Sequence, residues 1–149
     1  MKSIILSLSL IAVALAGCGD DSNDSEPSLA GLWRFAWETD GKDDADIQTV
    51  ELTQDGKAVS GRGCATHYED RAGTFLLANV TCGNDKYVGT LQGSQLELQL
   101  LPADTTQKPY ALHLSVDEAH TMLVGTGQGA RCTACAISAT RIKIGDTRL

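Results

Sequence analysis

The chain has 149 residues, which fits one domain, and its 42% hydrophobic content excludes a disordered protein. Its formal net charge is −7, from 12 basic and 19 acidic residues, so its surface repels phosphate backbones and nucleic-acid binding is not expected. The 15 glycines separate short apolar runs, which favours all-β structure over helical structure.

The first residues have the features of an export signal. Lys2 supplies a positive charge, and the apolar stretch 4–16 is shorter than the ~20 residues of a spanning helix. The tetrapeptide Leu15-Ala16-Gly17-Cys18 then resembles the lipobox of bacterial lipoproteins. That resemblance implies cleavage between Gly17 and Cys18 and lipidation of the Cys18 thiol. The alternatives are a plain secretory signal with an incidental cysteine, or a buried N-terminal strand.

Lipidation of Cys18 would place the domain in the cell envelope, anchored to a membrane by two or three acyl chains such as palmitate. Gly19 does not match the aspartate typical of inner-membrane retention, so the resemblance favours the outer membrane. Residues 19–28 (GDDSNDSEPS) are polar and acidic, which indicates a flexible tether. The predicted organisation is a signal peptide at 1–17, a lipidated cysteine with its tether at 18–28, and a folded domain at 29–149.

The folded domain reads as a series of short strands. Trp33, Phe35 and Trp37 alternate with smaller or polar residues, so they share one face of the first strand. Asp55-Gly56 predicts a tight hairpin, and 82–85 a further turn. More strands are predicted at 50–53, 58–61, 74–81, 86–91, 95–100, 110–116, 121–126 and 136–144. About eight or nine strands with no helical period predict an up-and-down antiparallel β-barrel of about eight strands, with a β-sandwich as the alternative.

The two ends of this domain carry a family resemblance. Gly31-Leu32-Trp33 resembles the Gly-x-Trp start of the calycin barrels, the lipocalin and avidin group, and Ala139-Thr140-Arg141-Ile142 is similar to their last strand. The resemblance implies that Arg141 packs over Trp33 where the barrel closes. The middle of the chain lacks the other lipocalin motifs, so the resemblance implies a shape and no ligand. Trp33, Phe35 and Trp37 could line a ligand cavity or fill the core.

Four cysteines follow Cys18, and an exported protein favours disulfides among them. Three pairings are possible, and Cys64–Cys82 with Cys132–Cys135 is favoured because each bond joins residues around a predicted strand–turn–strand unit. Closing the first loop would stabilise the fold by about 3 kcal/mol. Alternatively, Cys132-Thr133-Ala134-Cys135 is a thiol–disulfide redox motif, although no helical pattern follows it. A zinc site would need a second close pair of cysteines.

Other candidate groups are weaker. His67, His113 and His120 lack metal-ligand spacing, and His67 to Asp70 reads equally well as an acid–base group or a polar loop. The acidic run 38–46 does not match a calcium-binding loop. No catalytic residue, metal or cofactor is expected. The predicted function is a non-enzymatic envelope lipoprotein whose disulfide-stapled barrel binds a small apolar ligand or an envelope protein, with redox chemistry at Cys132 and Cys135 as the alternative.

Overall fold

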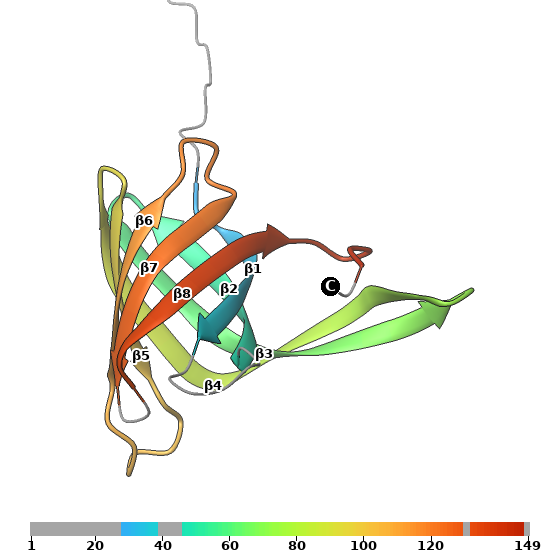
Figure 1. Cartoon of the computed structure of the whole chain (residues 1–149), viewed down its shortest axis with the longest axis horizontal. Coiled ribbons are helices and arrows are strands. Elements are labelled where there is room, and N and C mark those ends of the chain that lie inside the picture. The colour runs from blue at the N-terminus through green and yellow to red at the C-terminus, as the bar shows by residue number, and fades with distance from the viewer. Residues whose placement is uncertain (1–27, 39–45, 130–131, 148–149) are drawn as a thin grey trace, which may run out of the picture.

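The computed structural model describes residues 28–38, 46–129 and 132–147, and in these ranges the chain forms a closed antiparallel barrel (Figure 1). Neighbouring strands pair in chain order, and β1 also pairs with β8 to close the sheet. The prediction of an eight-stranded up-and-down barrel is confirmed, and the β-sandwich alternative is wrong. The strands are β1 (Gly31–Glu38), β2 (Asp46–Asp55), β3 (Ala58–Arg71), β4 (Thr74–Gln92), β5 (Gln95–Leu101), β6 (Tyr110–Val116), β7 (Met122–Gly129) and β8 (Cys132–Ile142).

Alternation along the strands builds the core. In β5 the leucines at 96, 98 and 100 are buried while the polar residues between them are exposed, since successive side chains point to opposite faces of a sheet. The same pattern in β1 buries Trp33 and Phe35 completely. Among the described residues, no helix is long and apolar enough to cross a membrane.

Glycines shape the turns at one end of the barrel. Gly56 between β2 and β3 has φ 56°, and Gly93 between β4 and β5 has φ 59°, a left-handed conformation that glycine adopts without strain. Each turn leaves two residues between paired strand ends, as tight hairpins require. The hairpin predicted at Asp55-Gly56 is therefore present.

The predicted turn at 82–85 is wrong. These residues belong to β4, and Cys82 lies opposite Cys64 on β3. The chain reverses instead at Ala72 and Gly73, which have φ 55° and 84°. A register shift between Arg62 and Cys64 accommodates the irregular pairing. Two predicted strands, 74–81 and 86–91, are therefore one strand.

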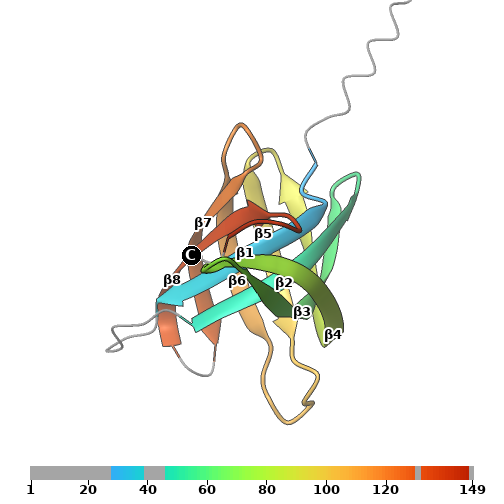
Figure 2. The ribbon, with the colours of Figure 1, turned by 90° about the vertical axis from the view of Figure 1, so that its right-hand side faces the viewer.

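Beyond the disulfide, β3 and β4 leave the barrel as a two-stranded extension, residues 65–81, which we call the arm (Figures 1 and 2). The C-terminal segment runs beside the arm: the Leu77 N–H donates to the Asp146 carbonyl, and the Gly145 N–H donates to the Leu77 carbonyl, both at 2.8 Å. On the barrel side, Arg34 donates a hydrogen bond of 3.0 Å to the Tyr68 hydroxyl. These contacts tie the arm to the barrel wall and the C-terminus.

Candidate functional site: the open end of the barrel

One end of the barrel is closed by the residues around the start of β1. Leu29 is fully buried, and its carbonyl accepts a hydrogen bond of 2.8 Å from the Trp33 indole. The Cζ of Arg141 lies 5.1 Å from the centre of the Trp33 ring, so the expected cation–π contact is present. Arg141 also donates to the Ser28 carbonyl. These residues close the end at which β1 begins and β8 finishes.

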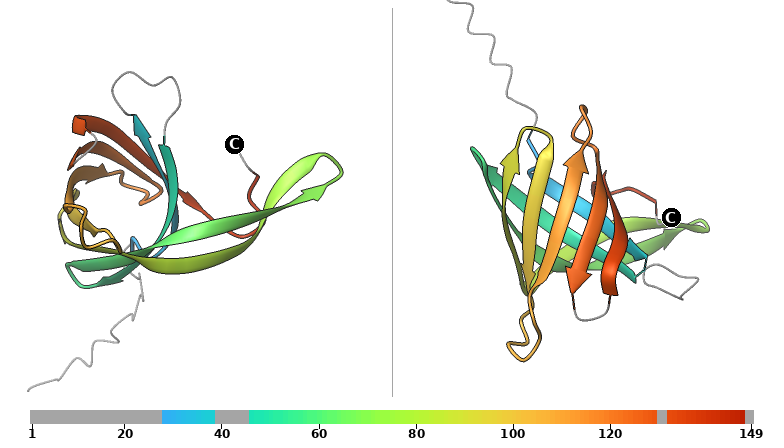
Figure 3. Two further views of the ribbon diagram at one scale, coloured as in Figure 1. Left: turned by 90° about the horizontal axis from the view of Figure 1, so that it is seen from below. Right: turned by 60° about the vertical axis from the view of Figure 1, so that its left-hand side comes forward.

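The opposite end of the barrel contains a cavity of about 640 Å³, which we call the mouth cavity. Residues from β1, β2, β4, β5, β6, β8 and the β5–β6 loop surround it, and the left view of Figure 3 shows the ring of strands. The lining residues are Trp37, Asp46, Ile47, Gln48, Asp85, Leu100, Pro102, Ala103, Asp104, Gln107, Tyr110 and Cys135. The barrel therefore has one closed end and one end that contains a cavity.

Of the three aromatic residues predicted on one face of β1, only Trp37 lines the mouth cavity. Its ring meets the ring of Tyr110 from β6 edge to face, with centroids 6.3 Å apart. Trp33 and Phe35 belong to the packed core, with no exposed surface. The cavity interpretation therefore applies to Trp37 and the core interpretation to Trp33 and Phe35, because β1 runs from the closed end of the barrel to the mouth cavity.

A part-buried hydrogen bond between β2 and β4 braces the barrel wall. The Tyr87 hydroxyl donates a hydrogen bond of 2.6 Å to the Gln48 side-chain oxygen, and the Tyr87 ring lies 6.1 Å from that of Phe35. Burial, and then the charge of Asp85, raise the pKa of the Tyr87 phenol well above its usual value, so Tyr87 remains a donor. Sequence reasoning did not select Tyr87 or Gln48, since each reads as an ordinary member of an alternating strand.

The charged residues among the described lining of the mouth cavity are all acidic. Its lining includes Asp46, Asp85 and Asp104, and none of the described lining residues is Lys, Arg or His. Asp85 accepts a hydrogen bond of 2.8 Å from the Ala103 N–H. The hydroxyl and then the N–H of Thr106 hold the pKa of the Asp104 carboxyl below its usual value. The described lining of the mouth cavity therefore carries negative charge.

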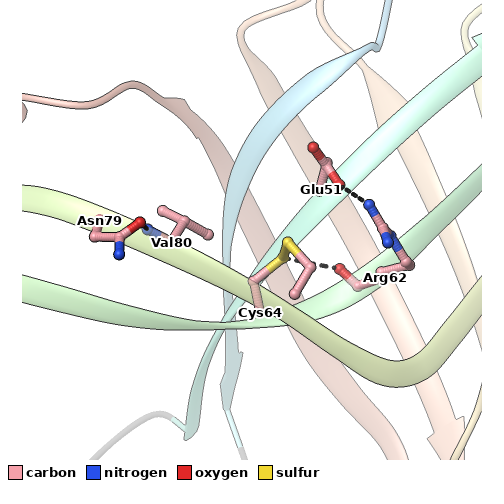
Figure 4. The surroundings of a disulfide bond; sticks show 6 residues. Glu51, Arg62, Cys64, Asn79 and Val80 are labelled. Carbon is pink, nitrogen blue, oxygen red and sulfur yellow. Dashed lines mark hydrogen bonds and ion pairs between the residues drawn. A yellow bond between two sulfur atoms is a disulfide. The ribbon is translucent and has the colours of Figure 1, made fainter.

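The cysteines occupy two places. Cys64 and Cys82 form a disulfide where the arm leaves the barrel, beside the ion pair of Arg62 with Glu51 at 2.8 Å (Figure 4). Cys135 is disulfide-bonded, 2% exposed and part of the mouth-cavity lining. The side chain of Cys132, its expected partner, lies outside the described part, so that pairing stays a prediction. Residues 134–142 continue as strand, without the helix that activates a redox cysteine.

The remaining predicted residues do not gather. His67 lies on the arm, His113 faces outward 3.8 Å from Glu97, and His120 lies in the β6–β7 turn. Among the described residues, no group of three or more His, Cys, Asp or Glu is arranged to hold a metal ion. Gly17, Cys18 and most of the acidic run 38–46 lie outside the described ranges. The predicted lipid anchor therefore stays an expectation from the sequence.

Comparison with known proteins adds no relative. No protein-family model matches the chain, and no curated protein matches it.

Proposed function

We propose that this protein is a lipid-anchored envelope binding protein that holds a small ligand with an apolar body in the mouth cavity. The observation that carries the proposal is the cavity of about 640 Å³ at the hollowed end of a barrel whose other end is closed. Sites for small molecules are concave, mostly apolar and commonly about 300–1,000 Å³. Eight-stranded barrels have room for one small ligand.

The lining suits an apolar ligand body. Trp37 and Tyr110 offer aromatic surface, and Leu100 contributes aliphatic surface below them. The Gln48 side chain is fixed by Tyr87, which leaves its amide N–H groups as donors of defined position. A few oriented polar groups within an apolar lining provide specificity in small-molecule sites.

The proposed lipid anchor would orient the mouth cavity away from the membrane. Ser28, the first described residue, lies at the closed end, where its carbonyl accepts a hydrogen bond from Arg141. A tether from Cys18 to Ser28 extends at most about 35 Å. A lipid on Cys18 would hold the closed end near the membrane and direct the mouth cavity toward the aqueous compartment, where a ligand arrives.

The test is binding of the neutral fluorescent probe N-phenylnaphthylamine, whose emission rises in an apolar site. Ala103 is exposed at the mouth cavity, so Ala103→Trp places a large ring there without disturbing the core. We expect this variant to weaken probe binding about tenfold or more, since the ring occupies the volume needed. Ala119→Trp, at an exposed position in the β6–β7 turn of the closed end, is the matched control.

Two results would contradict the proposal. One is the absence of saturable probe binding to the wild-type protein. The other is equal binding to both tryptophan variants and the wild type, which would assign the probe to another surface. Unchanged thermal unfolding of both variants shows that the comparison concerns binding and not folding.

A further inference from the structure

We infer that the mouth cavity selects organic cations, namely ammonium compounds with an apolar body, over neutral and anionic ligands of the same shape. The inference rests on the proposed function, because it names the class of ligand that the same cavity takes. Two independent features of the lining support it, the charge of its rim and the aromatic surface of its wall.

The first feature is uncompensated negative charge. Elsewhere on the barrel and arm, glutamates lie beside basic groups, as in the ion pairs of Arg62 with Glu51 and of Arg71 with Glu69. Within the described residues, Asp46, Asp85 and Asp104 form no such pair, although all three line one cavity. Like charges gathered in a concave site attract a cation and repel an anion.

The second feature is the aromatic pair. Cations bind favourably over the face of a tryptophan or tyrosine, and aromatic walls recognise quaternary ammonium groups in this way. At the closed end the face of Trp33 is occupied by Arg141. Trp37 instead contacts the ring of Tyr110 in an edge-to-face arrangement and borders the mouth cavity. Its indole therefore lies beside the space that a bound ligand would fill.

The absence of a metal-binding arrangement among the described residues favours an organic cation over a metal ion. Asp46 starts β2, Asp85 lies within β4, and Asp104 lies in the β5–β6 loop, so the three carboxylates reach the cavity from different elements of its lining. No described group of His, Cys, Asp or Glu converges as a metal site requires. Hard metal ions need several oxygen ligands at about 2–2.6 Å, whereas a bulky ammonium group is weakly hydrated and is attracted over longer distances.

The experiment compares two ligands of nearly the same shape, phenyltrimethylammonium and its neutral carbon analogue tert-butylbenzene, by calorimetry and by displacement of N-phenylnaphthylamine. The wild type should bind the cation about tenfold more tightly than the neutral analogue. The preference should weaken as ionic strength rises, because the carboxylates are partly exposed.

Variants that remove negative charge inside or outside the mouth cavity test whether its carboxylates cause the preference for a cation. In Asp46→Asn/Asp85→Asn the new amides keep an oxygen in place, so Asn at position 85 can still accept from the Ala103 N–H. We expect this variant to lose about fivefold or more of its affinity for the cation and little for the neutral compound. Glu97→Gln/Glu118→Gln removes the same charge from exposed positions outside the cavity and should leave both affinities unchanged.

The outcomes distinguish failure of the cation inference from failure of the proposed function. Equal binding of the two ligands, or equal effects of the two double variants, overturns the cation inference while probe binding leaves the proposed function standing. No binding of either ligand or of the probe overturns both. A rise in unfolding temperature with calcium that disappears in Asp46→Asn/Asp85→Asn identifies a metal site and overturns the organic cation.

Discussion

Removal of the Cys64–Cys82 disulfide tests how the arm and the barrel are joined. Both cysteines are half-buried at the base of the arm, so Cys64→Ser/Cys82→Ser introduces no fully buried polar group. The bond closes a loop with a sequence separation of 18. The chain-entropy treatment gives about 3 kcal/mol for a loop of that size, lost mainly because the unfolded chain becomes freer. For a domain of about 120 residues this lowers the unfolding temperature by about 12 °C.

The arm allows the entropic origin of this effect to be tested separately. Replacing residues 66–80 with Asn-Gly gives a tight hairpin directly beyond the Ala65–Thr81 pair. The disulfide then closes a loop of about five residues, for which the same treatment gives about 2 kcal/mol. The shortened protein lacks the contacts of the arm with the C-terminal segment whether or not the disulfide is present. These contacts therefore cancel when the shortened proteins with and without the disulfide are compared.

The assay is urea unfolding of the four proteins, followed by tryptophan fluorescence and far-ultraviolet circular dichroism. No reductant is added, because Cys135 is also disulfide-bonded. A loss below about 1 kcal/mol in the full-length protein, or an equal or larger loss in the shortened one, would refute the loop-entropy reasoning. The bond would then act through strain or through contacts of the folded state.

Two further predictions concern the barrel wall. Gly125→Ala should lower the free energy of unfolding by more than about 2 kcal/mol in urea, since a Cβ there would overlap the His113 carbonyl, whereas Gly83→Ala, with its nearest atom at 3.7 Å, should unfold like the wild type. Tyr87→Phe should cost about 1 kcal/mol at neutral pH by removing the hydrogen bond to Gln48. Because folding raises the pKa of the Tyr87 phenol, the stability it contributes is fully present below about pH 10 and falls above it, by at most about 1.4 kcal/mol per pH unit. The Tyr87→Phe variant should lack this decrease in the free energy of unfolding above about pH 10. A pH dependence identical to that of the wild type would contradict the burial of the Tyr87 phenol.

The sequence predicted an up-and-down barrel, with a β-sandwich as the alternative, because many strands and turns depend on local signals. Alternation in 95–100 and 110–116 sets which side chains face inward, and Asp55-Gly56 sets a hairpin, each within a few residues. The Cys64–Cys82 pairing was favoured among three because it joins residues around a predicted strand–turn–strand unit, and it is present. The contact of Arg141 with Trp33 followed from a resemblance at the two ends of the chain, which barrel closure brings together.

Only the tertiary structure decided where strands continue and which residues share the mouth cavity. Residues 82–85 have the composition of a turn, yet Cys82 pairs with Cys64 and Lys86 pairs with Arg62, so residues 83–85 continue β4 as an irregularity in its pairing with β3. Asp46, Asp85 and Asp104 are far apart in the chain and each reads as an ordinary exposed carboxylate. They line one cavity because closure of the barrel brings the start of β2, the middle of β4 and the β5–β6 loop together, and such long-range placement leaves no periodic trace in the sequence.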